Sequence, residues 1–253
     1  MIGIHLISEK GHPVSLFIRK IAAATIFTLV ATASNAATPT HLYEFSGNLS
    51  DSYGGLDLVA NGGSLVGGNY IFGADQGLAV DSALSANGNV YTIDTSFRFD
   101  ETSGYRRIVD FQDRTSDTGL YNLDTALNFY NITTGTAGAF ANGQQVRVTI
   151  SRDAAGTFSG YVNGALQFSF VDATSLASFS SANQRANFFQ DDTAVPGEAS
   201  AGSVDYIAIY DHALSATDVA ALAAPVPEPA TYALMLAGLL TVGAMARRRG
   251  RGR

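Results

Sequence analysis

Few side chains in this 253-residue chain could do acid–base or nucleophilic chemistry. Residues 37–225 contain three glutamates, Glu44, Glu101 and Glu198, and they lie far apart in the sequence. A serine–histidine mechanism has little support, because His41 and His212 lie near the expected edges of the domain and no Gly-x-Ser-x-Gly motif occurs. Cysteine is absent, which excludes disulfides and thiolate metal sites. We therefore expect no catalytic activity.

Three aspartates that lie close together, Asp110, Asp113 and Asp117, offer oxygen ligands for a hard cation such as calcium. Their spacing is not that of an EF-hand loop. Neighbouring arginines, Arg107 and Arg114 among them, could instead form ion pairs with the same carboxylates. The sequence leaves both interpretations open.

The charge of the chain is unevenly distributed. Residues 37–225 contain seven arginines, no lysine and twenty acidic residues, a net charge of −13, whereas the whole chain carries −7. Such a surface repels nucleic-acid phosphates and anionic lipids, and it favours divalent cations or neutral polymers. Nucleic acid is therefore excluded as a partner.

Sugar binding commonly combines an aromatic face with polar side chains that hold hydroxyl groups. Tryptophan is absent, so the stacking residues available are tyrosines: Tyr53, Tyr105, Tyr121, Tyr130 and Tyr161. Most tyrosines in a β-rich domain only pack against the core or its rim. The ligand-binding residues therefore stay undetermined at this point.

Alternation of apolar and polar residues, the period of a half-buried β-strand, runs through most of the chain after Leu42. It is clearest in residues 90–99, 146–150 and 166–170. Glycine, asparagine, serine and aspartate interrupt the pattern at short intervals. We predict an all-β fold, an antiparallel β-sandwich or barrel.

Several details of this pattern are specific. In the strand expected at residues 90–99, we expect the polar residues to face water: Thr92, Asp94, Ser96 and Arg98. Leu166 is expected to face inward. Asn163 and Gly164 predict a tight hairpin turn, because both residues readily take positive φ. Ser215 and Asp218 predict the start of a short helix, with Ser215 as its cap.

The N-terminal residues have the pattern of an export signal. Two basic residues precede the apolar stretch 21–30, and small residues follow it up to Ala36. We interpret residues 1–36 as a signal peptide with an extended leader and a helical apolar part, cleaved between Ala36 and Ala37. An uncleaved anchor is the alternative, although the apolar stretch is short for a membrane span.

The C-terminal segment, residues 226–253, has three ordered features. These are Pro227, Glu228 and Pro229, the uncharged run 230–246, and the cluster that begins with Arg247, Arg248 and Arg249. The run is at the short end of the roughly 17 to 25 residues that span a bilayer, so we predict a transmembrane helix. The arginines would stay on the cytoplasmic side and leave the preceding residues outside.

This order of features resembles the PEP-CTERM sorting tail of Gram-negative bacteria. In that family, a membrane protease of the exosortase type recognises and removes the tail, and the protein goes on to the cell surface or into exopolysaccharide. The resemblance implies transient membrane insertion, an exosortase-type partner and an extracellular location. A permanent membrane anchor is the alternative.

Residues 37–225 resemble the laminin-G-like, concanavalin A-like jelly-roll modules of secreted bacterial proteins. The similarity is carried by residues 42–55, with their Asp-Ser-x-Gly loop, by the paired strands of 152–164, and by 204–215. It implies a jelly-roll β-sandwich. It says little about function, because this fold hosts lectins, hydrolases and spacers.

Relatives of this fold often hold a structural calcium ion between the closing and the first strand. Carried over to this sequence, the ligands would be Asp205, Glu44 and the region of Gly47, although Asp205 could equally be a solvated strand residue. Laminarinase-like hydrolases on the same fold need Glu-x-Asp-x-x-Glu on one strand, and that pattern is missing here.

The sequence thus predicts an exported, non-catalytic surface or matrix protein that associates with extracellular polysaccharide, with calcium as a candidate cofactor. Two alternatives stay open. One is a glycan-active enzyme with an unfamiliar acid pair, and the other is a purely structural or adhesive protein.

Overall fold

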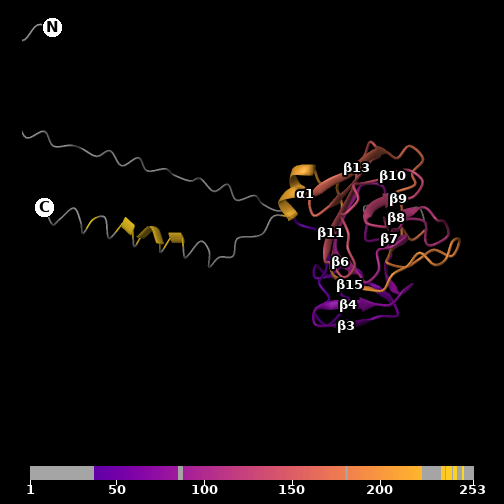
Figure 1. The fold of residues 1–253 in the computed structure, drawn as a ribbon, viewed down its shortest axis with the longest axis horizontal. Coiled ribbons are helices and arrows are strands. Elements are labelled where there is room, and N and C mark those ends of the chain that lie inside the picture. Colours follow the sequence, from indigo (N-terminus) through magenta and orange to yellow (C-terminus); the bar gives the residue numbers. More distant parts are fainter. Residues whose placement is uncertain are drawn as a thin grey trace, which may run out of the picture. The chain divides into compact units, whose positions relative to one another are not determined.

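The computed structural model describes residues 37–84, 88–179 and 182–223, together with residues 235, 236, 238–240, 242, 243 and 247 of the tail. Two antiparallel β-sheets pack face to face (Figure 1). Sheet A contains β1 (His41–Tyr43), β3 (Ser64–Val66), β4 (Asn69–Phe72), β6 (Tyr91–Phe99), β11 (Val146–Arg152), β12 (Thr157–Val162), β13 (Ala165–Val171) and β15 (Gly202–Tyr210). Sheet B contains β2 (Val59–Asn61), β5 (Gly77–Val80), β7 (Tyr105–Asp110), β8 (Gly119–Leu123), β9 (Ala126–Phe129), β10 (Thr133–Thr134) and β14 (Ala186–Phe188). The predicted antiparallel β-sandwich is confirmed.

The order of strands places sequence-distant segments side by side. Sheet A runs β13-β12-β11-β6-β15-β4-β3, with β1 also paired to β15, and sheet B runs β10-β9-β8-β7-β14-β5-β2. The two central strands of sheet A, β6 and β15, are more than 100 residues apart in the chain. Any site on the middle of this sheet is therefore built from both halves of the domain.

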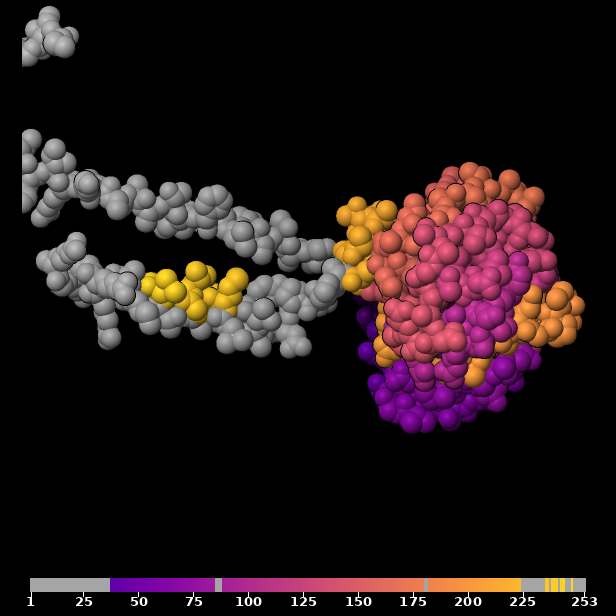
Figure 2. Space-filling model, in the orientation of Figure 1, coloured from indigo at the N-terminus to yellow at the C-terminus, as the bar shows by residue number. Residues whose placement is uncertain are grey.

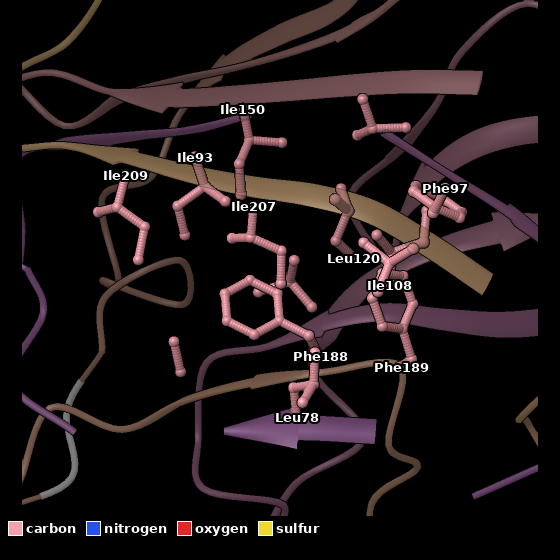
Figure 3. Close-up of a cluster of buried hydrophobic side chains, with 14 of the residues drawn as sticks. Leu78, Ile93, Phe97, Ile108, Leu120, Ile150, Phe188, Phe189, Ile207 and Ile209 are labelled. Carbon is pink, nitrogen blue, oxygen red and sulfur yellow. The ribbon is translucent and has the colours of Figure 1, made fainter. Parts of the chain in front are cut away.

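The core fills the space between the sheets. Figure 3 shows Ile93, Phe97, Ile150, Ile207 and Ile209 of sheet A pointing toward Leu78, Ile108, Leu120 and Phe188 of sheet B, with Phe189 beside them. Phe189 stacks on Phe72 with ring centroids 4.7 Å apart. Burial of apolar area at about 25 cal/mol per Å² is the main stabilising term available to a chain without disulfides.

The predicted hairpin turn joins β12 and β13. Asn163 and Gly164 have φ angles of 51° and 80°, as a tight turn with two positive φ values requires. A Cβ atom on Gly164 would lie 2.7 Å from the Cβ of Ala223, so this glycine is also needed for the close approach of a helix.

That helix is α1 (Ala216–Ala223), which lies at one end of the sandwich (Figure 1). Its predicted cap is confirmed: the Asp218 amide donates to Ser215 Oγ, and Asp218 Oδ2 accepts from the Ser215 amide at 3.1 Å. Val219 is buried against Tyr161 and Tyr210 on the outer face of sheet A, the face turned away from sheet B.

Two predictions about exposure are wrong. Thr92 and Asp94 were expected to face water and are buried, because the residues before α1 lie over Thr92, and Arg147, Thr149 and Tyr206 surround Asp94. Thr92 Oγ1 donates to the His212 carbonyl and accepts from the Leu214 amide. Leu166, expected to be buried, is 55 % exposed, because a register shift between β12 and β13 turns it to the other face.

The predictions for both ends fall largely outside the described residues. Outside them lie the signal peptide 1–36 with Ala36, and the sorting residues Pro227, Glu228, Pro229, Arg248 and Arg249. Ala37 is described and packs against the cluster that Val219 of α1 forms with Tyr161 and Tyr210. Arg247 is an exposed helical residue. Within the described part of the chain, no helix has the length and apolar character needed to cross a membrane.

Candidate functional site

A cavity of about 530 Å³ opens on the outer face of sheet A. Its walls come from β1, β6, β11 and β15 and from the turn between β3 and β4. The lining residues are Pro39, Leu42, Glu44, Ser46, Gly67, Gly68, Asp94, Arg147, Asp205, Tyr206, Ala208 and Tyr210. Its volume lies within the roughly 300–1,000 Å³ of small-molecule sites.

The cavity exists because β15 changes partner along one edge. Strand β4 pairs with residues 202–204 and β1 pairs with residues 207–209, so neither strand pairs with Asp205 or Tyr206. On its other edge, β15 carries a bulge between Val204 and Tyr206. A bulge redirects the side chain of the extra residue, and Asp205 is exposed at the cavity wall.

An ion pair between the buried Asp94 and the partly buried Arg147 forms the floor. Asp94 Oδ1 accepts from Arg147 Nε at 2.8 Å and from Thr149 Oγ1 at 2.7 Å, and Asp94 Oδ2 accepts from the Tyr206 hydroxyl at 2.8 Å. Arg147 also donates to the Leu222 carbonyl, which ties the network to α1. The guanidinium and the carboxylate are thus fixed by several partners each, and the cavity has a rigid polar floor.

Two tyrosines border this floor: Tyr206 is partly exposed, whereas Tyr210 is 3 % exposed and packs against Val219 of α1. Burial and the negative charge of Asp94 raise the pKa of Tyr210 to about 12 and also raise the pKa of Tyr206. Both phenols therefore keep their protons at physiological pH. With aromatic rings, hydroxyls and carboxylates together, the cavity can bind a ring-shaped ligand that carries many hydroxyl groups.

Two of the three residues predicted to bind calcium line this cavity. Glu44 and Asp205 line the same cavity, and Glu44 Oε2 accepts from Ser52 Oγ at 2.9 Å. Gly47 is not among the lining residues, and its amide donates to the Phe45 carbonyl in a turn. A calcium site at Glu44 and Asp205 stays a prediction.

The aspartates at 110, 113 and 117 do not form one site. Asp110 lies 3.2 Å from the buried Arg107 guanidinium, Asp117 lies 3.8 Å from it, and Asp113 lies 3.9 Å from Arg185. Ion pairing with arginine, the alternative that the sequence left open, describes the contacts of Asp110.

A different acidic cluster forms on sheet B. Carboxylate oxygens of Asp117, Asp192 and Glu198 lie within 4.8 Å of one another and could hold a cation. Asp192 and Glu198 belong to the connection between β14 and β15, which protrudes from the sandwich as the orange segment in Figure 2. This cluster was not predicted from the sequence, because some 75 residues separate Asp117 from Asp192.

Burial and the charge of Asp117 raise the pKa of Glu198, a member of that cluster, to about 7. Its Oε2 atom is buried and has no hydrogen-bond partner among the described residues.

The five tyrosines singled out from the sequence separate into three groups. Tyr105, Tyr121 and Tyr130 form an edge-to-face cluster on sheet B, with ring centroids 5.4 to 6.2 Å apart. Tyr161 packs under α1, and Tyr53 is 54 % exposed. The tyrosines of the sheet A cavity, Tyr206 and Tyr210, were missed, although their place on the closing strand could have indicated them.

Residues 72–220 match the family model described as concanavalin A-like lectin/glucanases superfamily, and residues 225–249 match the PEP-CTERM protein-sorting motif. No curated protein sequence matches the chain.

Several solved structures share the fold at low sequence identity. A Trypanosoma rangeli sialidase in complex with 2,3-difluorosialic acid is 13 % identical, with a TM-score of 0.59 over 74 % of this chain and 33 % of its own. Domain 4 of an extracellular arabinanase from Geobacillus stearothermophilus, in complex with arabinotriose, is 18 % identical, with a TM-score of 0.54 over 75 % of this chain and 100 % of its own. The binding domain of botulinum neurotoxin serotype D is 13 % identical, with a TM-score of 0.53 over 73 % of this chain and 51 % of its own. The chain thus spans about a third of the sialidase, and these likenesses show the fold alone.

Proposed function

Because the chain belongs to the concanavalin A-like lectin/glucanases superfamily and carries a PEP-CTERM motif, we propose that it is a non-catalytic surface protein that binds a neutral extracellular polysaccharide in the sheet A cavity. The motif indicates export and sorting to the extracellular side by an exosortase system.

The composition of the cavity is the observation that carries this proposal. Three carboxylates, those of Glu44, Asp94 and Asp205, line it with one guanidinium. Three carboxylates against one guanidinium give the lining a net negative charge, which disfavours an anionic ligand. Neutral sugars suit such a lining, because carboxylates accept hydrogen bonds from hydroxyl groups and a tyrosine ring can contact the apolar face of a pyranose.

A likeness supports this choice of ligand without establishing it. The arabinanase domain with the same fold, which this chain matches along that domain's full length, was solved in complex with a neutral oligosaccharide, arabinotriose. Its low identity carries no residue-level correspondence, so the site proposed for this chain rests on the cavity itself.

A cavity-filling substitution tests the proposal. Ser46→Arg introduces a long side chain from an exposed lining position, and Ser103→Arg makes the same change at an exposed position outside the lining. We expect Ser46→Arg to reduce retention of the protein by neutral polysaccharides in affinity electrophoresis at least tenfold, and Ser103→Arg to leave it unchanged. Equal retention of both variants would remove the sheet A cavity from consideration. A wild-type protein that no polysaccharide retains would favour the purely structural or adhesive alternative.

One observation favours a second function, a glycan-active enzyme. Glu198, whose pKa is raised to about 7, lies close to Asp117. A carboxyl group with a raised pKa beside a second carboxyl group is the arrangement of a general acid and its partner. Polysaccharide turnover by the wild type that Glu198→Gln abolishes would establish that function in place of the one proposed.

A further inference from the structure

A second, smaller cavity lies on the outer face of sheet B, the opposite side of the sandwich from the sheet A cavity. Its volume is about 230 Å³, below the roughly 300–1,000 Å³ of drug-sized sites, so it would hold one small ring. Strand β2, the end of the β14 segment and the loop after β7 surround it. The residues used below are Val59, Ala79, Asp113, Arg114, Arg185 and Asn187.

Strand register builds the floor of this cavity. Val59 pairs with Ala79 across β2 and β5, and Ala79 pairs with Asn187 across β5 and β14. The three side chains therefore form a row on one face of the sheet. The methyl group of Ala79 leaves space above the strands, and the amide of Asn187 borders that space.

Asn187 is the feature that points to a ligand. The residue is 2 % exposed and lines the cavity, and its buried Nδ2 atom has no hydrogen-bond partner within the described part of the chain. A buried donor that lacks an acceptor is destabilising, so most such groups in native proteins have a partner. A ligand oxygen in the cavity would provide the missing acceptor.

The charges around the rim indicate the kind of ligand. Arg114 and Arg185 line the cavity with one lining carboxylate, Asp113. Both arginines have partners already: Arg114 donates to Gln190 Oε1 at 3.1 Å and pairs with Asp75 at 3.0 Å, and Arg185 lies 3.5 Å from Asp81 and 3.9 Å from Asp113. Each guanidinium group has five N–H donors, so one that pairs with an aspartate can still donate to a ligand carboxylate.

We propose that this cavity binds one hexuronate residue, a sugar ring that carries a carboxylate. The carboxylate would lie toward Arg114 and Arg185, and a ring or hydroxyl oxygen would accept from Asn187 Nδ2. The identification of the ligand as a sugar rests on the proposed function, whereas the anionic class rests on the arginines and the amide. With cavities on opposite outer faces, one molecule would contact two polysaccharide chains, a neutral one and an acidic one.

Isothermal titration of the purified protein with single sugars tests the inference. The probes are the methyl glycosides of glucuronate, galacturonate and mannuronate, with methyl glucoside as the neutral comparison. We expect at least one uronate to bind, with an affinity that falls as salt is added. Any binding of the neutral glucoside belongs to the sheet A cavity, so it should be lost in Ser46→Arg and kept in Asn187→Leu. Asn187→Leu and Arg185→Gln should each weaken uronate binding at least tenfold.

Two variants make the titration specific. Arg98→Gln removes an arginine from the other sheet, and Ser46→Arg fills the sheet A cavity, so both should bind the uronate as the wild type does. Asn187→Leu removes the unpaired donor, and we expect it to melt no lower than the wild type, which separates loss of binding from loss of folding.

Several results would overturn the inference. They are binding of the glucoside that Asn187→Leu abolishes, full binding of the uronate by both sheet B variants, loss of uronate binding in Ser46→Arg, or no binding of any of the three uronates. Retention of the wild type and of Ser46→Arg by neutral polysaccharides is measured separately, so failure here is distinguishable from failure of the proposed function.

Discussion

Glu198 is placed where its ionisation should affect stability. Its carboxyl group lies beside those of Asp117 and Asp192, and its pKa is raised from 4.5 to about 7 in the folded protein. Between these values the folded state holds a proton that the unfolded chain has released. At this group the folded state therefore binds more protons than the unfolded state, and the contribution of Glu198 to the free energy of unfolding falls as pH rises through this window.

We expect the melting temperature of the wild type to decrease between pH 4.5 and pH 7. In Glu198→Gln this decrease should be smaller, because the amide cannot ionise. Thermal melts of both proteins across the window provide the measurement, and Glu101→Gln, an exposed glutamate, is the matched control. Parallel curves for the wild type and Glu198→Gln would contradict the prediction.

Asp205 leads to a prediction about calcium. Glu44 and Asp205 line one cavity in an acidic protein, and carboxylates at a strand bulge could hold a hard cation. Calcium should raise the melting temperature of the wild type and should have no effect on Asp205→Ala. The exposed residue Asp57, replaced by alanine, is the control. A wild type that shows no rise with calcium has no such site.

At the scale of elements, the packing of α1 on sheet A depends on the β12–β13 turn. Gly164 has a φ of +80°, and a Cβ atom there would lie 2.7 Å from Ala223. Gly138 has a similar φ of +87°, and a Cβ atom added to it would meet no atom of the described residues within 4 Å. The two glycines therefore share the backbone strain and differ only in the contact with α1.

We expect Gly164→Ala and Gly138→Ala both to lower the free energy of unfolding by about 1 kcal/mol through the positive φ. Gly164→Ala should cost a further 1–3 kcal/mol, roughly the range for overpacking. Urea denaturation of both variants gives the difference. Equal losses would show that α1 moves away from the turn without cost.

The elements also explain which parts of the pattern were misread. Alternation along β6 and β11 correctly predicts which residues enter the core, because most residues of the inner face are apolar. It does not tell whether water or other parts of the chain cover the outer face, and so Asp94 was expected to be exposed. Nor does it predict a register shift such as the one that turns Leu166 outward.

At the scale of the whole molecule, the sandwich separates its charges. The sheet A cavity is lined by three carboxylates and one arginine, whereas the sheet B cavity is lined by two arginines and one carboxylate. The net charge of −13 for residues 37–225 conceals this difference. A charge total limits the classes of partner, but the position of each charge on the fold decides which ligand a given face can hold.

The sequence alone determined the fold class, the Asn163-Gly164 turn, the cap of α1 and the sorting motif, because each depends on neighbouring residues. The tertiary structure decided the sites. Asp94, Arg147 and Tyr206 meet at one cavity, and Asp117 meets Glu198 at another place, only because strands distant in the chain lie side by side. Local pattern reports the conformation of a segment and the face that it buries. It carries no information on which distant side chain will lie across from that face, since that follows from strand order and register.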